Sequence, residues 1–234
     1  MERALAVAAV LLSTLPQLGS GGPGETGAPQ AEKRAEIEPR KPGAEAPAFE
    51  LTTLDGRKVT SADLAGDAGE PLGRREKRIL VVVFWARLCP WVEKWDPDLQ
   101  AACQKFASEP RVRFVVIDSD KNEQRDPAAI RKYLEGAKLT FPVYLDAGCK
   151  AADAFGASVT PHCFVVGKDG RIVYTGRIND QNPLDEDKTP KTPPVRATPR
   201  PKNPLLEKAV EAALEGKTPE VTVDVPMGCR LKRQ

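Results

Sequence analysis

The chain of 234 residues has 35 basic and 33 acidic side chains, and its formal net charge is +2. Because these charges are well mixed along the chain, the sequence predicts no basic surface and therefore no nucleic-acid partner. Hydrophobic residues make up 41% of the sequence, which suffices for one core, whereas 22 prolines and 18 glycines indicate long segments outside that core.

Residues 1–20 have the pattern of a secretory signal peptide. A short charged start at residues 1–3 precedes an apolar run over residues 4–15, and small residues at 19–22 offer a cleavage region. The apolar run is shorter than the ~20 residues of a membrane-spanning helix. We therefore expect an extracytoplasmic protein, periplasmic or secreted, and the alternative is an uncleaved signal that acts as a membrane anchor.

The segment that follows predicts a tether and then the start of a domain. Residues 21–46 are rich in Gly, Pro, Glu, Lys and Ala and lack hydrophobic periodicity, which is typical of a flexible tether. A short hairpin is expected next, with strands at 49–54 and 57–60, and a brief helix begins at Ser61. Residues 67–77 are expected to form a polar loop before the central strand.

The central strand leads into the most informative motif of the chain. The apolar run 79–85 predicts a buried strand, and Cys89-Pro90 then opens an amphipathic helix. The apolar positions of that helix recur at helical spacing, at Trp91, Trp95, Leu99, Cys103 and Phe106. A cysteine at a helix start faces unpaired N–H groups and the positive end of the helix dipole, which favours the nucleophilic thiolate. Cys89 is therefore the candidate nucleophile, and the alternative is a buried cysteine that merely precedes a helix.

The rest of the chain alternates between strands and helices and then changes composition. Strands are expected at 113–117, 141–145, 162–166 and 171–176, helices from Asp126, over 148–155 and from Pro204, and a small edge strand at 221–225. Seven prolines between Pro183 and Pro204 predict that residues 179–204 form a stiff, extended linker. Residues 205–234 are expected to form a C-terminal helix and a cysteine-containing tail.

The order of these motifs resembles that of thioredoxin-fold redoxins. Residues 84–92 are similar to the F-W-A-x-W-C-x-x-C signature, and residues 47–56 are similar to the P-x-F-x-L-x-x-x-D-G opening of redoxins and peroxiredoxins. Residues 159–161 resemble the stretch that ends in the family's cis-proline. Gly228-Cys229 is similar to the Gly-Cys near the C-terminus of a peroxiredoxin-like group, of the alkyl hydroperoxide reductase type, with a Cys-Pro active site.

This resemblance implies an α/β, thioredoxin-like fold for residues 47–178. The fold has a central mixed sheet flanked by helices, and the C-terminal helix and tail extend it. The resemblance also implies that the bond before Pro161 is cis. In this fold, that turn keeps a backbone edge open opposite Cys89, where a substrate pairs.

The chain departs from the family pattern around the nucleophile. Val92 stands where a thioredoxin has its second cysteine, so no local Cys-x-x-Cys pair forms, and Leu88 replaces the usual tryptophan. Peroxiredoxins place a threonine three residues before the nucleophile and a proline seven before it, where this chain has Ala86 and Val82. The resemblance therefore implies the fold more directly than the reaction.

Without a local partner, an oxidised Cys89 needs another thiol to resolve it. Cys103 lies ~21 Å further along the same helix, outside disulfide reach. Cys149 and Cys163 lie on elements that are expected to be held by packing. Cys229 follows a glycine on a tail that is plausibly free to move, so it is the candidate resolving thiol. The alternative is a docked tail in which Cys229 is buried or structurally paired.

Two function classes remain open. The first is an exported thiol-dependent oxidoreductase that uses Cys89 in thiol-disulfide exchange or peroxide reduction, with an external thiol as reductant. The second is a thioredoxin-fold binding module with degraded redox activity. His162, the only histidine, points away from Cys89 on its strand. Because no C-x-x-C or H-x-x-x-H pair occurs, neither a metal nor another cofactor is expected.

Overall fold

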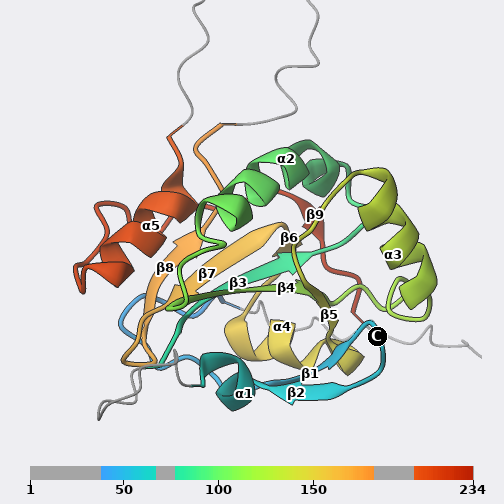
Figure 1. Ribbon diagram of the computed structural model, residues 1–234, viewed down its shortest axis with the longest axis horizontal. Coiled ribbons are helices and arrows are strands. Elements are labelled where there is room, and N and C mark those ends of the chain that lie inside the picture. The colour runs from blue at the N-terminus through green and yellow to red at the C-terminus, as the bar shows by residue number, and fades with distance from the viewer. Residues whose placement is uncertain (1–37, 67–76, 182–202, 234) are drawn as a thin grey trace, which may run out of the picture. The chain divides into compact units, whose positions relative to one another are not determined.

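The computed structural model describes residues 38–66, 77–181 and 203–233. A mixed sheet of seven strands forms the centre of the fold, in the order β2-β1-β5-β4-β3-β7-β8 (Figure 1). The strands are β1 (Glu50–Thr53), β2 (Lys58–Thr60), β3 (Ile79–Trp85), β4 (Val112–Asp118), β5 (Val143–Leu145), β7 (His162–Val166) and β8 (Ile172–Gly176). The predicted signal peptide and the greater part of the predicted linker lie outside the described residues.

β3 is the central strand, and it is buried along its whole length. It runs parallel to β4 on one side and antiparallel to β7 on the other. Because side chains alternate along a strand, Val83 and Trp85 pack into the core on one face of the sheet, and Val82 and Phe84 pack into the core on the other. The continuous apolar run thus predicted the buried strand correctly.

Helices cover both faces of the sheet (Figure 1). The face that contains Trp85 carries α2 (Pro90–Lys105), α3 (Pro127–Gly136) and α5 (Leu205–Leu214). The face that contains Phe84 carries α1 (Ser61–Ala65) and α4 (Lys150–Phe155), and the latter follows the 3-10 turn η1 (Ala147–Cys149). Within the described ranges, no helix combines the length and the apolar character that crossing a membrane requires.

A buried carboxyl group joins β3 to α2 and α3. The indole Nε1 of Trp85 donates a hydrogen bond of 2.8 Å to Asp96, and the hydroxyl of Tyr133 donates one of 2.7 Å to the same carboxyl. Burial raises the pKa of Asp96 to about 6, against the lowering effect of these two donors. The three side chains hold α2, and with it Cys89 at the start of α2, against the end of β3.

Residues 38–46, which composition assigns to the tether, contact the sheet and α4. The backbone N–H of Gly43 donates to the carbonyl of Ile172 at 2.8 Å, and that of Ala46 donates to Gly170 at 2.9 Å. Arg40 pairs in the same way with Phe155. The packed region therefore begins before residue 47, because backbone pairing holds a segment that has few apolar side chains.

The segment 221–225 meets β8 at an isolated bridge between Val223 and Thr175, where the sequence predicts a small strand. The N–H of Thr175 donates to Thr222, and the N–H of Asp224 donates to the carbonyl of Thr175. Val223 and Val225 are exposed. The alternation of valines therefore predicted an extended segment correctly, but only a single bridge forms.

The C-terminal helix α5 belongs to the same core as β3 and α2. Leu206 and Val210 are fully buried against it, and Lys105 of α2 forms ion pairs with Glu207 and Glu211 of α5, both at 2.7 Å.

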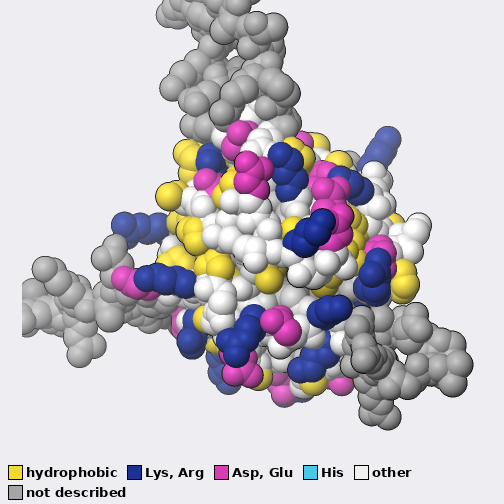
Figure 2. Space-filling view, turned by 90° about the vertical axis from the view of Figure 1, so that its left-hand side faces the viewer, with side chains coloured by type: hydrophobic (Ala, Val, Ile, Leu, Met, Phe, Trp, Pro, Cys, Tyr) yellow, Lys and Arg dark blue, Asp and Glu magenta, His cyan; other side chains and the backbone are white. Residues whose placement is uncertain are grey.

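Figure 2 shows basic and acidic side chains interspersed with hydrophobic ones on the face that it presents.

We expect Leu206→Ala to lower the free energy of unfolding by about 2–4 kcal/mol, because it leaves a cavity in the shared core. Denaturant unfolding monitored by circular dichroism measures this change. Lys208→Ala, on the exposed side of the same helix, is the control and should change stability by about 0.5 kcal/mol or less. Equal effects of the two variants would show that α5 is not part of the cooperative unit.

Candidate active site

Cys89 lies at the end of the short link that connects β3 to α2. It is the N-cap residue of α2, with φ −88° and ψ 117°, and Pro90 occupies the first turn. The short link from Trp85 is closed by a hydrogen bond of 3.1 Å from the N–H of Cys89 to the carbonyl of Ala86. Only 4% of Cys89 is exposed. The helix start predicted from the Cys-Pro step is therefore confirmed.

The Cys89 thiol is aimed at the backbone of Thr160. Its Sγ donates to the carbonyl oxygen of Thr160 at 3.1 Å. Thr160 belongs to the short strand β6 (Val159–Thr160), and the Thr160–Pro161 peptide bond is cis, as the sequence predicts. The predicted nucleophile and the predicted proline turn therefore meet, although they are far apart in the sequence.

The backbone edge beside Thr160 is not open, contrary to the expectation that it awaits a substrate. It pairs antiparallel with β9 (Cys229–Arg230) of the tail, with Cys229 opposite Thr160 and Arg230 opposite Val159 (Figure 1). The N–H of Leu231 adds a hydrogen bond of 3.0 Å to Ser158. The tail of this chain thus occupies the edge on which an extended substrate was expected to pair.

Gly228 permits this docking. A Cβ atom at this position would lie 2.0 Å from the carbonyl oxygen of Thr160 and 3.2 Å from the nitrogen of Pro161. Both neighbours are backbone atoms, so neither can rotate away. The glycine that precedes Cys229 is therefore required by the close approach of two backbones.

Further contacts hold the end of the tail. The ammonium group of Lys232 lies 3.7 Å from the carboxylate of Asp120, and the carbonyl of Lys232 accepts a hydrogen bond of 3.2 Å from Lys121. Arg233 pairs with Asp153 at 2.5 Å and also donates to the carbonyl of Ala157. The end of the tail is therefore attached to the loop after β4 and to α4 with the residue that follows it, so the prediction that Cys229 lies on a free segment is wrong.

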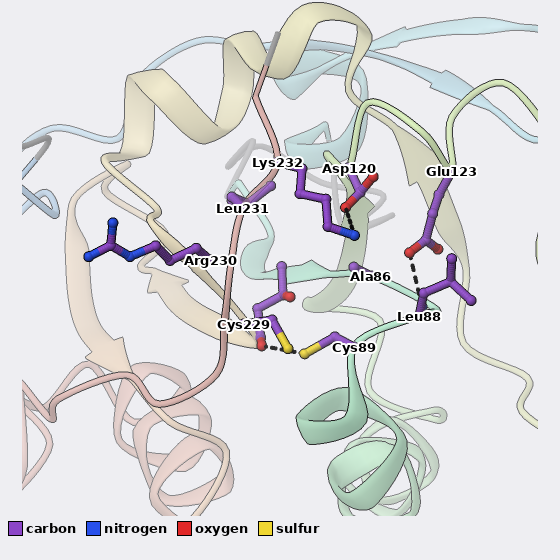
Figure 3. A pocket seen from close by; sticks show the side chains of 10 residues that line it. Ala86, Leu88, Cys89, Asp120, Glu123, Cys229, Arg230, Leu231 and Lys232 are labelled. Atoms are coloured by element: carbon purple, nitrogen blue, oxygen red, sulfur yellow. Dashed lines mark hydrogen bonds and ion pairs between the residues drawn. The ribbon is translucent and has the colours of Figure 1, made fainter. Parts of the chain in front are cut away.

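Docking places the two cysteines side by side. Figure 3 shows the sulfur atoms of Cys229 and Cys89 pointing toward one another, and their thiols are hydrogen-bonded. Both cysteines are free. Burial, followed by the hydrogen bond to Cys89, raises the pKa of Cys229 to about 11. The backbone N–H of Trp91, at the start of α2, opposes this shift. Cys229 therefore keeps its proton at neutral pH.

The two sulfurs face a small cavity of about 80 Å³. Its lining comes from the β3–α2 link, the loop after β4, β6 and the tail, namely Ala86, Leu88, Cys89, Asp120, Glu123, Thr160, Cys229, Arg230, Leu231 and Lys232. Ala86 presents a methyl group where peroxiredoxins have a threonine hydroxyl. The site thus combines two thiols with carboxylates from a loop that the sequence analysis did not single out.

Those carboxylates come from the end of β4. Glu123 accepts a hydrogen bond of 2.9 Å from the N–H of Leu88, and its other oxygen lies 3.6 Å from Arg87. Asp118 is fully buried, and its pKa rises to about 8, because burial and the charge of Glu123 both disfavour ionisation. Their position was foreseeable, since ligand and active sites of parallel sheets lie beyond the carboxyl ends of the strands.

The other cysteines do not reach the site. Cys149 is buried and donates to the carbonyl of Ser119 at 2.9 Å, and burial raises its pKa to about 11. Burial also raises the pKa of Cys103 to about 12 and that of Cys163 further. Within the parts of the chain that the structure describes, Cys229 is thus the thiol that accompanies Cys89.

His162 lies on the opposite face of the sheet from Cys89, as expected from strand alternation. It packs against Phe164, with ring centroids 4.4 Å apart, and its Nε2 shares a hydrogen bond of 2.9 Å with Thr175. Burial lowers its pKa to about 3, so the ring is neutral. It is a core histidine and not a base for Cys89.

Comparison with known proteins places this geometry in a family. Residues 42–175, more than half of the chain, match the model of the AhpC/TSA family. The chain belongs to this family. It is 29% identical over 139 residues to the thiol-disulfide oxidoreductase ResA of Bacillus cereus, an alignment that covers 59% of this chain and 71% of that protein.

Two further similarities extend this finding. A protein of Mycobacterium tuberculosis whose name places it among the peroxiredoxins is 28% identical over 144 residues, covering 56% of this chain and 82% of its own length. The crystal structure of a Sinorhizobium meliloti protein superposes with a TM-score of 0.66 at 23% identity, covering 84% of this chain and 97% of that one. The AhpC/TSA match and this superposition confirm the thioredoxin-like fold.

We expect Gly228→Ala to displace the tail, because the added methyl group would overlap the Thr160 carbonyl. Cys229 should then react at least about tenfold faster with an alkylating agent, because it loses its half-buried position beside Cys89. Quantitative mass spectrometry of the labelled peptides measures the rates. Gly136→Ala is the matched control, since a Cβ there meets nothing within 4 Å. An unchanged Cys229 rate in Gly228→Ala would show that the tail docks without the glycine.

The raised pKa of Asp118 predicts a pH dependence of stability. The unfolded carboxyl has a pKa of 3.8 and the folded one about 8, so the folded state binds more protons between these values. The contribution is therefore present at low pH and is lost as the pH rises through about 8. We expect the free energy of unfolding to fall over this range in the wild type and to fall less in Asp118→Asn. Urea unfolding at a series of pH values tests this, and identical slopes would contradict it.

Proposed function

We propose that this chain is an exported thiol-dependent oxidoreductase in which Cys89 is the nucleophile and Cys229 the resolving thiol. The observation that carries the proposal is the direct contact between these two free thiols at the start of α2. The sequence lacks a second cysteine at Val92, and the folded tail supplies one from another part of the chain. An oxidoreductase of the AhpC/TSA family therefore has a complete dithiol without a Cys-x-x-Cys motif.

The environments of the two thiols support different roles. Cys89 is the N-cap residue of α2, so its sulfur lies at the end of the helix where the unpaired backbone N–H groups and the positive end of the helix dipole are. Cys229 has a raised pKa, so it stays a thiol until Cys89 has reacted. An oxidised Cys89 has Cys229 as its nearest partner, so the cycle closes within one chain.

Thiol-disulfide exchange is the reaction that this arrangement supports best. Cys89 attacks a substrate disulfide and forms a mixed disulfide, which Cys229 resolves to give the Cys89–Cys229 disulfide. An external thiol then reduces that disulfide. The relatives named thiol-disulfide oxidoreductase agree with this direction of chemistry. An extended polypeptide substrate would have to displace β9 from Thr160, whereas a small disulfide can enter through the cavity.

Peroxide reduction is the second candidate, and the cavity is the observation that favours it. A space of about 80 Å³ beside Cys89 admits a small oxidant while the tail stays docked. The Ala86 side chain offers no hydroxyl to orient a peroxide, so we expect slow peroxide turnover. The intact dithiol argues against the alternative of a binding module whose redox chemistry has decayed.

Export rests on the sequence of residues 1–20, which have the charged start, apolar run and small residues of a signal peptide. Periplasmic and secreted compartments are oxidising, so a dithiol enzyme there has disulfide substrates available. N-terminal sequencing of the protein recovered from the extracytoplasmic fraction tests this part of the proposal. Recovery of the full-length chain from the cytoplasm alone would contradict it.

Mild oxidation should convert the wild type to a monomer with a Cys89–Cys229 disulfide, because the two sulfurs are already in contact. Peptide mapping under non-reducing conditions identifies the bond. In Cys229→Ser, Cys89 should instead form a sulfinic acid or an intermolecular disulfide. Cys103→Ser is the matched control and should give the same intramolecular disulfide as the wild type. Equal overoxidation of Cys89 in the wild type and in Cys229→Ser would refute the resolving role.

A further inference from the structure

Two buried carboxyl groups near the dithiol each have one oxygen without a hydrogen-bond donor. Asp118 is 0% exposed and Glu123 is 2% exposed. Asp118 Oδ2 and Glu123 Oε2 are both buried without a hydrogen-bond partner. The two groups also lie close enough to hydrogen-bond to each other. Two acceptors that face each other in a buried place can form that bond only if one of them carries a proton.

The remaining oxygens of the pair are already occupied. Asp118 Oδ1 accepts the N–H of Asp120 at 2.9 Å, and Glu123 Oε1 accepts the N–H of Leu88 at 2.9 Å. Each carboxyl group thus has one oxygen bonded to a backbone N–H and one buried oxygen without a donor. A shared proton is therefore the group that completes the hydrogen bonding of the pair.

The charges around the pair compensate only one negative charge. Arg87 lies 3.6 Å from Glu123, and its Nε has no hydrogen-bond partner. Asp120 adds a third carboxylate, but it is paired with Lys232 of the tail at 3.7 Å. One nearby positive charge, that of Arg87, thus accompanies two carboxyl groups. This is the charge expected if one of the two carboxyl groups is protonated.

The pair is connected to the reacting sulfurs in two ways. Glu123 accepts a hydrogen bond from the N–H of Leu88, the residue before Cys89. The side chain of Glu123 also lines the cavity that both sulfurs face (Figure 3). A cavity of about 80 Å³ is large enough for a few water molecules, which can carry a proton between polar groups. Glu123 and the dithiol therefore line the same small cavity.

We propose that Asp118 and Glu123 share one proton and pass it to and from the Cys89–Cys229 dithiol during its redox cycle. This inference rests on the proposed function, because it assigns a proton carrier to that reaction. Asp118 does not itself line the cavity, so it acts as a positioning residue that sets the proton affinity of Glu123.

The proton balance of the oxidative half-cycle is closed. Cys89 as thiolate attacks a substrate disulfide R–S–S–R′, whose S–S bond breaks with its electron pair going to R′S. The pair gives its proton through water to R′S and releases R′SH, which leaves both carboxyl groups ionised. Cys229 then returns a proton to the pair as its sulfur attacks Cys89 and expels RS⁻. Two electrons pass from the dithiol to the substrate, and the pair ends as it began.

A metal site and a purely structural role are the other interpretations of these carboxylates. Among the described residues, no group of three His, Cys, Asp or Glu side chains is placed to hold a metal ion. A structural role would make the pair important for stability alone. The two roles differ in their effect on the pH dependence of the thiol chemistry.

The experiment compares Asp118→Asn and Glu123→Gln with the wild type. Each amide supplies a permanent N–H donor to the remaining carboxylate, so the pair stays bonded but can no longer exchange a proton. Asp146→Asn is the matched control, because Asp146 is also a buried carboxyl with a raised pKa but does not line the cavity. The rate of oxidation by oxidised glutathione is followed by tryptophan fluorescence from low to high pH.

We expect the wild-type rate, corrected for the fraction of thiolate, to fall as the pH rises through about 8, where the pair loses its proton. Below that pH, Asp118→Asn and Glu123→Gln should react at least about tenfold more slowly and show no such fall. Asp146→Asn should retain the wild-type profile. Rates and profiles equal to the wild type in both variants would overturn the inference.

An infrared measurement on the wild type keeps the test decisive if the variants do not fold. A shared proton gives the C=O stretching band of a protonated carboxyl at neutral pH, and absence of that band would also overturn the inference. The proposed function fails separately, because it requires that oxidised glutathione produce the Cys89–Cys229 disulfide in the wild type. A disulfide that forms with an unchanged pH profile in both pair variants leaves the function standing and removes only the proton carrier.

Discussion

The backbone pairing between Thr160 and Cys229 is the constraint on which the site depends. It places the sulfur of Cys229 against that of Cys89. The pairing involves only two residues of each strand, and it requires that the backbone of Gly228 approach that of Thr160 closely. A pairing this short is weak in isolation, since an isolated two-stranded ribbon is only marginally stable. The ion pairs of Lys232 with Asp120 and of Arg233 with Asp153, together with the buried Leu231, hold the end of the tail against the loop after β4 and against α4.

The sheet supplies the other half of the geometry. β3 and β4 run parallel, so their carboxyl ends deliver Cys89 and the pair of Asp118 and Glu123 to the same edge. The carboxyl group of Asp96 fixes α2 against Trp85, so the start of α2 cannot shift relative to β3. Cys89, Cys229 and the carboxyl pair thus come from three separate parts of the fold that meet beside one cavity.

A dithiol assembled from distant segments differs physically from a Cys-x-x-Cys pair. In a local pair both thiols lie on one helix, and the connection survives as long as that helix does. In this chain the second thiol arrives on a separate tail, so its presence depends on docking free energy. The edge beside Pro161 then serves as the binding place of the chain's own tail, which limits extended substrates to conformations in which β9 is displaced.

The sequence by itself determined the features that local physics controls. Continuous apolar residues fixed β3, a Cys-Pro step fixed the start of α2 at Cys89, and the family motif around Pro161 predicted the cis bond. Only the tertiary structure decided where the tail lies, because docking depends on the approach of Gly228 to Thr160, a contact between segments without any shared local pattern. The carboxyl pair was likewise hidden, since Asp118 and Glu123 belong to a polar stretch in the sequence. Their burial, with one oxygen of each left without a donor, arises only when the loop after β4 packs against the β3–α2 link.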